Sequence, residues 1–391
     1  MNRLARFSFF HVIPFLVFLF WAAAFLNGQN QVNREFPASP GQRLSIQLKA
    51  GGTVRVTGWD RSLISVSYEE NGRGGGGLDI EFIETGQGLE IRSQRSRGDR
   101  RQWSNPHFEV HVPRQFDVEL DSMGGGLHLT DVEGIFTGKT MGGSLTLENV
   151  SGEARLTTMG GEIRLTDSDL DGSLKTMGGK VTFRDVVGDV EGSSMGGNVR
   201  YQNVRRRSGE FASPRGDPVE GTSADTVQIS TMGGSIEVDE APQGANVHTM
   251  GGGIHIANAS QFVKAKTMGG DIEIEDSEGW IQATTMGGDI EVSVMPGSRG
   301  DIVLVSMSGD IELRVPADFS MDLDLQIAYT RNSSKSYRIV SDFNFRQEQS
   351  SSWDYGKGTP RKYVYGTGSL GGGQNRIRIE TINGNIYLRK K

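Results

Sequence analysis

Three of the four Asp-Ile-Glu triplets in this sequence, those between residues 271 and 312, carry its most concentrated chemistry. In an extended strand, residues i and i+2 point to the same side, so each triplet would present two carboxylates on one face. Clustered carboxylate oxygens are the ligands that calcium prefers, and a pair of carboxyl groups can also serve as general acid and base. The six candidate binding residues are Asp271, Glu273, Asp289, Glu291, Asp310 and Glu312.

Two other interpretations compete with calcium binding at these acids. One is a solvated acidic face, which keeps a protein soluble and needs no ligand. The other is a polysaccharide-cleaving β-helix enzyme, but general acid–base catalysis requires carboxyl groups with separated pKa values, usually in a groove. The triplets repeat too regularly for one tailored site. We therefore expect no catalytic residues and no required cofactor, and we keep the polysaccharide-cleaving enzyme as the alternative.

The triplets belong to a longer pattern, in which the tripeptide Met-Gly-Gly recurs in steps of 18 residues. A fixed period of this kind is typical of stacked repeats, in which one short unit cannot bury its apolar face alone and must pack against neighbouring copies. The positions that could do chemistry are therefore set by the stacking of the repeats. The tripeptide begins at Met123, Met141, Met159, Met177 and Met195, and after an interruption at Met232, Met250, Met268 and Met286.

Each repeat predicts two short strands and two corners. Residues 144–148 (Ser-Leu-Thr-Leu-Glu) alternate polar and apolar side chains, and residues 154–158 alternate again. The glycine pairs suit corners, because glycine accepts positive φ without steric penalty. The first strand supplies large residues such as Leu145 and the second supplies small ones such as Ala154. We therefore expect a thin, closely packed interior in which large side chains face small ones.

Two topologies could use such a unit: a meander of antiparallel hairpins, or a coil whose turns stack in parallel. A meander of about twenty strands would exceed the ~10 strands at which open sheets usually curl or split. The coil also explains why residue identity repeats, since equivalent side chains stack about 4.8 Å apart. We therefore predict an all-β fold, a parallel β-solenoid (β-helix) with 18-residue coils. One threonine row accompanies the methionines: Thr140, Thr158, Thr176, Thr231, Thr249, Thr267 and Thr285.

The chain divides into four segments. Residues 1–28 contain Arg3 and Arg6 before an apolar run, which is typical of a signal peptide or an uncleaved N-terminal anchor. Residues 30–120 form a lead-in β region. Residues 121–316 form the Met-Gly-Gly repeat solenoid, with a polar insertion at 205–225. Residues 317–391 form an irregular segment and a closing C-terminal strand, in which residues 381–388 repeat the motif once more.

The N-terminal segment predicts export, and therefore a periplasmic, cell-surface or extracellular location. The chain has 391 residues, no cysteine and a formal net charge of −7. Neither a disulfide framework nor a lipid-attachment cysteine is possible, so stability must come from stacking. The acidic balance argues against nucleic acid as a partner. Contact with a membrane is expected only through an uncleaved N-terminal segment, and the sequence does not indicate the oligomeric state.

Three weaker signals have ordinary explanations. The methionine row could bind a soft metal such as copper(I) or react with oxidants, but methionine is also a flexible gap-filler, and we expect core packing. The tripeptide Arg-Gly-Asp at 97–99, 215–217 and 299–301 can be an integrin-binding motif, but charged glycine turns produce it readily and we favour coincidence. The six histidines show no metal-like spacing; His128 and His255 occupy outward positions in distant repeats.

Four features together resemble a known group of families. They are the N-terminal signal, residues 54–60 (Val-Arg-Val-Thr-Gly-Trp-Asp), the repeated Gly-Gly-x-Ile-x-Ile pattern, and residues 315–319 and 377–386. The chain resembles the bacterial "putative adhesin" families of unknown function, which are similar to head domains of auto-transporter-like adhesins. The resemblance covers nearly all of the chain after the signal. It implies an exported β-helical protein with an adhesive or scaffolding role in the cell envelope, and it brings no catalytic residues. We expect a surface polymer, a glycan or an envelope protein as the partner.

Overall fold

Strands account for all the regular structure in the computed structural model. The described residues are 31–49, 51–69, 78–95, 106–205, 226–331, 336–356 and 358–391, and they form 32 strands and no helix. None of these residues forms a helix that is long and apolar enough to cross a membrane. The predicted signal segment 1–28, residues 206–225 of the predicted insertion and the Arg-Gly-Asp tripeptides at 97–99 and 215–217 lie outside the described residues.

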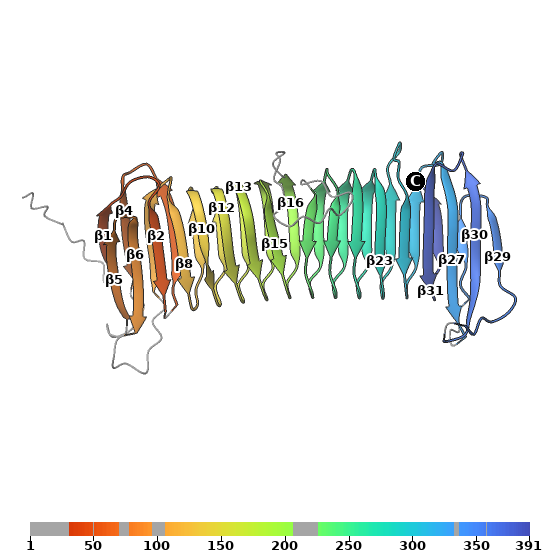
Figure 1. Cartoon of the computed structure of the whole chain (residues 1–391), viewed down its shortest axis with the longest axis horizontal. Helices are drawn as coiled ribbons and strands as arrows, with labels where there is room; N and C mark the ends of the chain where they lie inside the picture. Colours follow the sequence, from red (N-terminus) through yellow and green to blue (C-terminus); the bar gives the residue numbers. More distant parts are fainter. Residues whose placement is uncertain are drawn as a thin grey trace, which may run out of the picture. The chain divides into compact units, whose positions relative to one another are not determined.

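The strands lie in two rows, because each repeat contributes one strand to each row (Figure 1). The first row contains the strands that follow the Met-Gly-Gly tripeptides. Its members, in spatial order, are β1 (Gln31–Pro37), β4 (Leu63–Glu69), β7 (His107–Pro113), β3 (Thr53–Trp59), β9 (Leu127–Thr130), β11 (Leu145–Glu148), the start of β13 (Ile163–Thr176), β14 (Val181–Val187), β16 (Val199–Arg205), β18 (Ile236–Ala241), β20 (Ile254–Ala259), β22 (Ile272–Ser277), β24 (Ile290–Val294), β26 (Ile311–Val315), β32 (Ile386–Lys390) and β28 (Ile339–Ser341).

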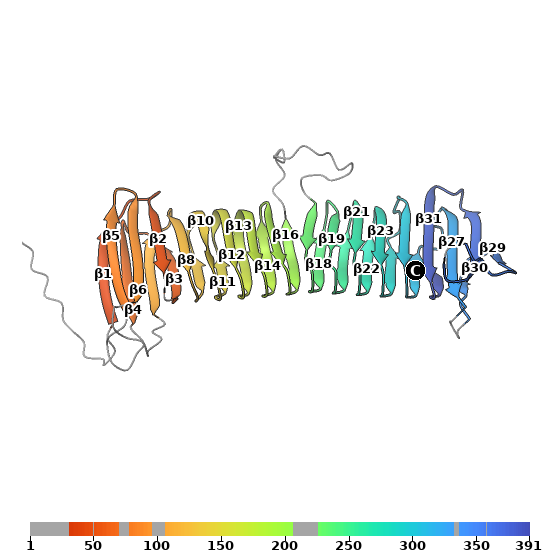
Figure 2. The same ribbon diagram turned by 60° about the horizontal axis from the view of Figure 1, so that its bottom comes forward.

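The second row contains the strands that precede the tripeptides, and its strands also stack side by side in both views (Figure 1 and Figure 2). Its members, in spatial order, are β5 (Leu78–Thr85), β6 (Gly88–Arg95), β2 (Arg43–Leu48), β8 (Asp117–Ser122), β10 (Glu133–Thr140), β12 (Ser151–Thr158), the end of β13, β15 (Val190–Ser194), β17 (Val227–Ser230), β19 (Ala245–His248), β21 (Phe262–Lys266), β23 (Trp280–Thr285), β25 (Ile302–Ser306), β31 (Asn375–Ile382), β27 (Met321–Thr330), β30 (Arg361–Leu370) and β29 (Arg346–Gln349).

Neighbouring repeats pair in parallel and keep equivalent residues in register. Leu127 pairs with Leu145, and Leu145 pairs with Ile163. The register continues across the insertion, because Val199 of β16 pairs with Ile236 of β18. Among the described strands, antiparallel pairs occur only near the two ends of the rows, at β1–β4–β7 and β5–β6, and at β27–β30–β29. The antiparallel meander is therefore excluded for the repeats, and the predicted all-β fold with parallel stacking is confirmed.

The core lies between the two rows, and the predicted division into large and small residues holds only in part, because the second row also buries large residues such as Leu156 and Leu174. Leu145 and Ile163 of the first row and Ala154 of the second row are at most 1 % exposed. A Cβ added to Gly192 would lie 2.7 Å from the ring of Phe183, so the large ring occupies the space that glycine leaves. Fully burying one large apolar side chain contributes about 1.5–3 kcal/mol, and successive repeats add such terms along the stack.

Buried hydroxyl groups join each repeat to the one before it. Thr158 Oγ1 donates a hydrogen bond to the carbonyl oxygen of Gly143 at 2.8 Å, and it accepts one from the backbone N–H of Gly161 at 3.1 Å. The Thr158 hydroxyl therefore satisfies backbone groups of two successive repeats. The same donation to the preceding glycine recurs at Thr140, Thr176, Ser194, Thr231, Thr249, Thr267, Thr285, Ser306 and Thr381.

Apart from Gly125, which has a φ of 93°, the glycine pairs have a different role from the predicted one. Neither Gly160 nor Gly161 has a φ in the left-handed region. A Cβ on Gly161 would instead lie 2.0 Å from the carbonyl oxygen of Gly143, whereas a Cβ on Gly160 would have its nearest neighbour at 3.7 Å. The second glycine is therefore needed because two backbones approach closely, and the first is not. Serine replaces the first glycine at Ser308, where the second glycine is kept as Gly309.

Left-handed backbone occurs at another corner, where the chain crosses from the first row to the second. Asp and Asn tolerate this conformation better than other residues with a side chain, because their short polar side chains bond locally. Asn203 Nδ2 also donates to Asp185 Oδ1 at 2.7 Å, which links two successive corners. The five residues with φ between 49° and 60° at this corner are Asp131, Asn149, Asp167, Asp185 and Asn203.

The two ends of the rows are not in chain order. Strand β2 lies between β6 and β8, and strand β3 lies between β7 and β9. At the other end, β32 lies between β26 and β28, and β31 lies between β25 and β27. The predicted closing strand at residues 381–388 is in fact the end of β31 and the start of β32, and neither strand ends its row. β28 lies beyond β32, and β27, β30 and β29 lie beyond β31. The outermost strand β29 carries Arg346 and Glu348, and charged edge strands resist pairing with other chains.

The close approach at the second glycine predicts different effects of two neighbouring substitutions. Gly161→Ala should destabilise the stack by about 1–3 kcal/mol, because its methyl group overlaps the Gly143 carbonyl. Gly160→Ala should change stability by less than about 1 kcal/mol, because its methyl group meets only ordinary contacts. Thermal unfolding and hydrogen exchange of the repeats flanking Gly161 would measure both. Equal effects at the two positions would contradict the assignment.

The hydroxyl row predicts a second pair of outcomes. Thr158→Val should cost about 1–3 kcal/mol, because it leaves the Gly143 carbonyl and the Gly161 N–H buried without a partner. Thr158→Ser should be much milder, since Ser194 makes both hydrogen bonds in another repeat. Chemical denaturation monitored by circular dichroism would compare the variants. If the valine variant were as stable as the serine variant, the Thr158 hydroxyl would not stabilise the stack and the prediction would be wrong.

Candidate functional site

The predicted aspartates lie in one column on the outward side of the first row, where they join successive repeats. Asp271 Oδ1 accepts a hydrogen bond from the backbone N–H of Asp289 at 2.8 Å. Asp289 Oδ1 accepts one from Asp310 at 2.7 Å, and Asp310 Oδ1 accepts one from Asn385 at 2.7 Å. At the equivalent position in an earlier repeat, Asn198 Oδ1 accepts from Ser235 at 2.9 Å. The acceptor oxygen, rather than the charge, is the feature that these positions share.

The predicted glutamates form a parallel column next to the aspartates. Glu273 is in register with Glu291, and Glu291 is in register with Glu312. Arg314 lies 2.7 Å from Glu312 and 3.7 Å from Glu291, measured between guanidinium nitrogens and carboxylate oxygens. The six predicted acids are therefore brought together as expected, but a basic side chain and backbone N–H groups already compensate part of their charge.

His255 lies beside this column, although the spacing of the histidines along the chain did not indicate a site there. His255 is in register with Glu273, and its Nδ1 is 3.2 Å from Glu273 Oε2. Its Nε2 is 3.6 Å from Glu275 Oε1. Ligand atoms of these three residues all lie within 4.8 Å of one another. The repeat length contains the signal, since His255 precedes Glu273 by one 18-residue step.

Basic side chains dominate the same face in earlier repeats. Arg164, Lys180 and Arg200 line a groove of about 320 Å³ together with polar residues of β14 and β16. Glu162 lies 2.8 Å from Arg164 and 3.3 Å from Lys180, and Arg200 Nε donates to Glu237 at 2.8 Å. The outward face of the first row therefore changes from basic to acidic along the stack.

The methionine row contradicts the predicted core packing. Ten methionine side chains, at Met123, Met141, Met159, Met177, Met195, Met232, Met250, Met268, Met286 and Met307, are 41–59 % exposed. The physical reason is the period of two: the preceding threonine or serine points inward to bond glycine, so the methionine points outward. The methionine row continues across the insertion, because the backbone N–H of Met232 donates a hydrogen bond to the carbonyl oxygen of Met195 at 3.2 Å.

At the start of the stack, the methionine row borders an apolar groove. The groove has a volume of about 520 Å³ and is lined by Met123, Met141 and Met159 together with Lys49 and Lys139. Thioether groups are flexible and polarizable, so such a row can adapt to differently shaped apolar surfaces. No residue of this edge was predicted as a binding residue, because we expected the methionines to lie inside.

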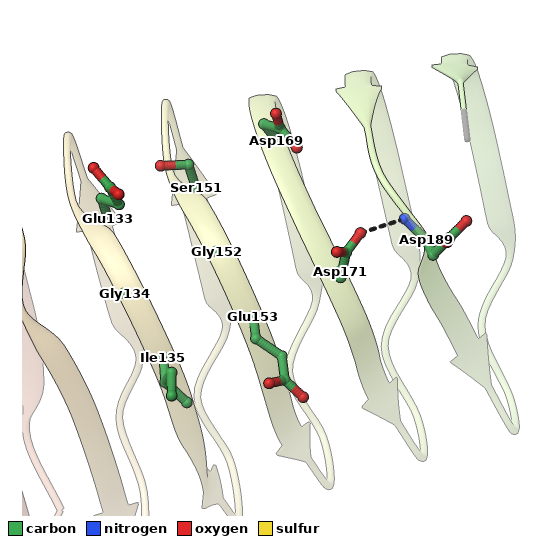
Figure 3. A pocket seen from close by; sticks show the side chains of 9 residues that line it. All are labelled: Glu133, Gly134, Ile135, Ser151, Gly152, Glu153, Asp169, Asp171 and Asp189. Carbon is green, nitrogen blue, oxygen red and sulfur yellow. Dashed lines mark hydrogen bonds between the residues drawn. The ribbon is translucent and has the colours of Figure 1, made fainter. Parts of the chain in front are cut away.

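A third groove, of about 690 Å³, lies where β10 and β12 begin, beside the middle of β13 (Figure 3). Carboxylates of Glu133, Glu153, Asp169, Asp171 and Asp189 line it, and Gly134 and Gly152 add no side chains to it. Asp171 Oδ1 accepts a hydrogen bond from the backbone N–H of Asp189 at 2.7 Å. At least Asp171 therefore joins two successive repeats by a hydrogen bond, as the members of the aspartate column do.

Asp60, Asp342 and Tyr363, in the terminal regions, have shifted pKa values. A hydrogen bond from Arg114 lowers the pKa of Asp60, and the backbone N–H of Lys390 lowers the pKa of Asp342. Burial raises the pKa of Tyr363, and its hydrogen bond to Asp354 raises it further. Both aspartates are held in the charged form that accepts hydrogen bonds, which is a structural arrangement and not that of a general acid.

The Arg-Gly-Asp tripeptide at 299–301 is part of the stack. Asp301 Oδ1 accepts a hydrogen bond from the backbone N–H of Arg376 at 2.9 Å. Gly300 N–H donates to Asn375 Oδ1 at 2.9 Å. These bonds join the turn before β25 to the start of β31, so local packing accounts for the motif.

Comparison with known proteins identifies the family. The model of the Toastrack DUF4097 family matches residues 42–389, and the chain belongs to this family. No curated protein matches the chain. One similar solved structure, from Clostridium sporogenes ATCC 15579, is described as a putative cell adhesion protein; it is 8 % identical, with a TM-score of 0.19, and the match covers 93 % of this chain and 100 % of that one. Another, from Parabacteroides distasonis ATCC 8503, is described as a putative lipid binding protein; it is 12 % identical, with a TM-score of 0.23, and the match covers 93 % and 97 %.

The aspartate column predicts that an acceptor atom matters more than a charge. Asp289→Asn should keep the bond to the Asp310 N–H and leave the thermal midpoint nearly unchanged, whereas Asp289→Ala should cost about 1 kcal/mol. Thermal unfolding of the two variants would test this. A calcium site would give the opposite pattern: a calcium-dependent rise in the midpoint that Asp289→Asn abolishes.

Proposed function

We propose that this member of the Toastrack DUF4097 family is an exported solenoid with 18-residue coils that acts by binding and not by catalysis. Its partner would be a protein of the cell envelope, contacted along the methionine row. The row of ten exposed methionines carries the proposal. Monomeric soluble proteins rarely expose a contiguous apolar patch larger than a few hundred Å² unless it is a contact surface.

The geometry of the row suits an elongated partner. Nine steps of about 4.8 Å extend the row over roughly 43 Å, which exceeds the reach of a small ligand. Methionine is common on surfaces that accept several partners, because its unbranched side chain repacks readily. Lys49 borders the groove at the start of the row and would favour an acidic group on the partner, whereas Lys139 already lies 3.5 Å from a carboxylate oxygen of Asp121, which also lines the groove. The adhesive role implied by the resemblance to adhesin head domains fits such a contact.

The polysaccharide-cleaving alternative is favoured by one observation, the acidic groove of Figure 3. Glu133 and Glu153 lie in that groove with three aspartates. Release of fragments from an acidic polysaccharide by the purified chain would favour this alternative over pure binding. The methionine row has no part in such a reaction, so the two proposals depend on different residues.

Site-specific photo-crosslinking in cells would test the binding proposal. A photoreactive amino acid at Met159 or Met268 should give an adduct of discrete size in the envelope fraction, because these positions face the partner. The same amino acid at Arg155 or Gln282, which are exposed on the second row, should give little adduct and serves as the matched control.

Two outcomes would contradict the proposal. One is an equal yield of adducts from all four positions, or none from the methionine positions. The other is recovery of the full chain, with residues 1–28 attached, in the cytoplasm.

A further inference from the structure

The cluster of His255, Glu273 and Glu275 has the features of a metal site on the first row. The ligand atoms of these side chains lie within 4.8 Å of one another in the structure. Glu273 and Glu275 are two residues apart on β22, so both point outward, and His255 reaches them from the adjacent strand β20. We propose that these three residues form a binding site for a divalent transition-metal ion of the zinc type.

The donor set selects the class of ion. Imidazole nitrogen and carboxylate oxygen are both ligand types that zinc accepts, and a site with three protein ligands leaves a fourth position for water. Calcium takes six to eight oxygen ligands and gains little from imidazole. The site therefore differs from the calcium site considered for the acidic triplets, in both its ligands and its ion, although it shares Glu273 with them.

The scaffold under the cluster is rigid. Ile254, Ile256, Ile272 and Ile274 flank the three ligands on their strands, and each is at most 2 % exposed. Ligands on well-packed strands keep their backbone positions, so only side-chain rotations are needed for binding. Glu273 and Glu275 now contact opposite ring nitrogens, and coordination requires both carboxylates to approach the same nitrogen.

Two further carboxylates flank the cluster, and each already lies against an arginine. Glu237 and Glu291 are in register with His255 and Glu273 on the two flanking strands. Arg200 and Arg314 lie against these flanking carboxylates, on the sides away from the cluster repeats. A protonated His255 would be held by the same carboxylates, so an ion pair alone is the competing explanation, and metal titration separates the two.

The chain contains its own control for this site. His128 occupies the same place in its repeat as His255, after Met-Gly-Gly-Gly and one apolar residue. Its register neighbours are Arg55 and Thr146, neither of which is a carboxylate. Removal of His128 therefore removes an equivalent imidazole without touching the proposed ligand set.

Calorimetric titration of zinc chloride into the purified full-length chain would test the proposal. The wild-type chain should bind one equivalent, and His255→Ala, Glu273→Gln and Glu275→Gln should each weaken binding at least about tenfold, since loss of a residue that only supports a ligand already costs 10–100-fold. His128→Ala should bind zinc as the wild type does. Calcium chloride should give no saturable heat at this site.

Three results would overturn the proposal: no saturable zinc binding by the wild-type chain, equal binding by the His255→Ala variant, or equal weakening by His128→Ala. Circular dichroism of each variant would show that the fold is kept, as expected for substitutions of partly exposed side chains. The proposal does not depend on the partner of the methionine row, so neither result decides the other.

Discussion

The stack depends on the close approach of glycine backbones at one corner of every repeat. The second glycine of each tripeptide lies against its counterpart in the preceding repeat, where a Cβ would overlap a carbonyl oxygen, for example at 2.0 Å for Gly161. The buried hydroxyl of Thr158 then bridges the two glycines. Because each bridge satisfies polar groups of two repeats at once, stability grows by nearest-neighbour terms along the stack. The apolar core adds to this arrangement but does not by itself fix the register.

The same corner determines what the surface can offer. An inward threonine places the following methionine outside, and repetition turns one exposed thioether into a row. On the first row, the outward positions carry arginine and lysine in early repeats and aspartate and glutamate in late ones, so neighbouring stretches of one surface differ in charge. A stacked architecture can therefore vary its contact surfaces repeat by repeat while its interior stays constant.

Much of the fold could be predicted from the sequence, because the signals were local and repeated. Alternation at residues 144–148 predicted a strand, and the shared identity of Thr140, Thr158 and Thr176 predicted parallel stacking in register. The role of the glycine pairs was predicted wrongly, since a sequence does not distinguish positive φ from close backbone approach. The left-handed corner at Asp131 and Asn149 was missed, although Asp or Asn recurs there in five repeats. The placement of β32 between β26 and β28 has no local signal, because it depends on pairing over 75 residues.

The candidate surfaces were harder to predict. The acidic columns formed as expected, but their hydrogen bonds to the next repeat depend on side-chain geometry that spacing does not reveal. The methionines were assigned to the core by their apolar character, although the period of two, counted from an inward threonine, places them outside. The proximity of His255 to Glu273 follows from one repeat length, so histidine spacing has to be read across strands as well as along the chain.

Disulfide formation would test most directly whether equivalent residues of successive repeats lie side by side. The chain has no cysteine, so an introduced pair of cysteines cannot form a disulfide with any native residue. Thr146 and Arg164 are outward register partners on adjacent strands, at a separation of about 4.8 Å that a disulfide can span. Cysteines at 146 and 164 should form an intramolecular disulfide on mild oxidation, whereas cysteines at 146 and 182, two repeats apart, should not. Crosslinking of the distant pair, or failure of the adjacent one, would contradict the parallel stack.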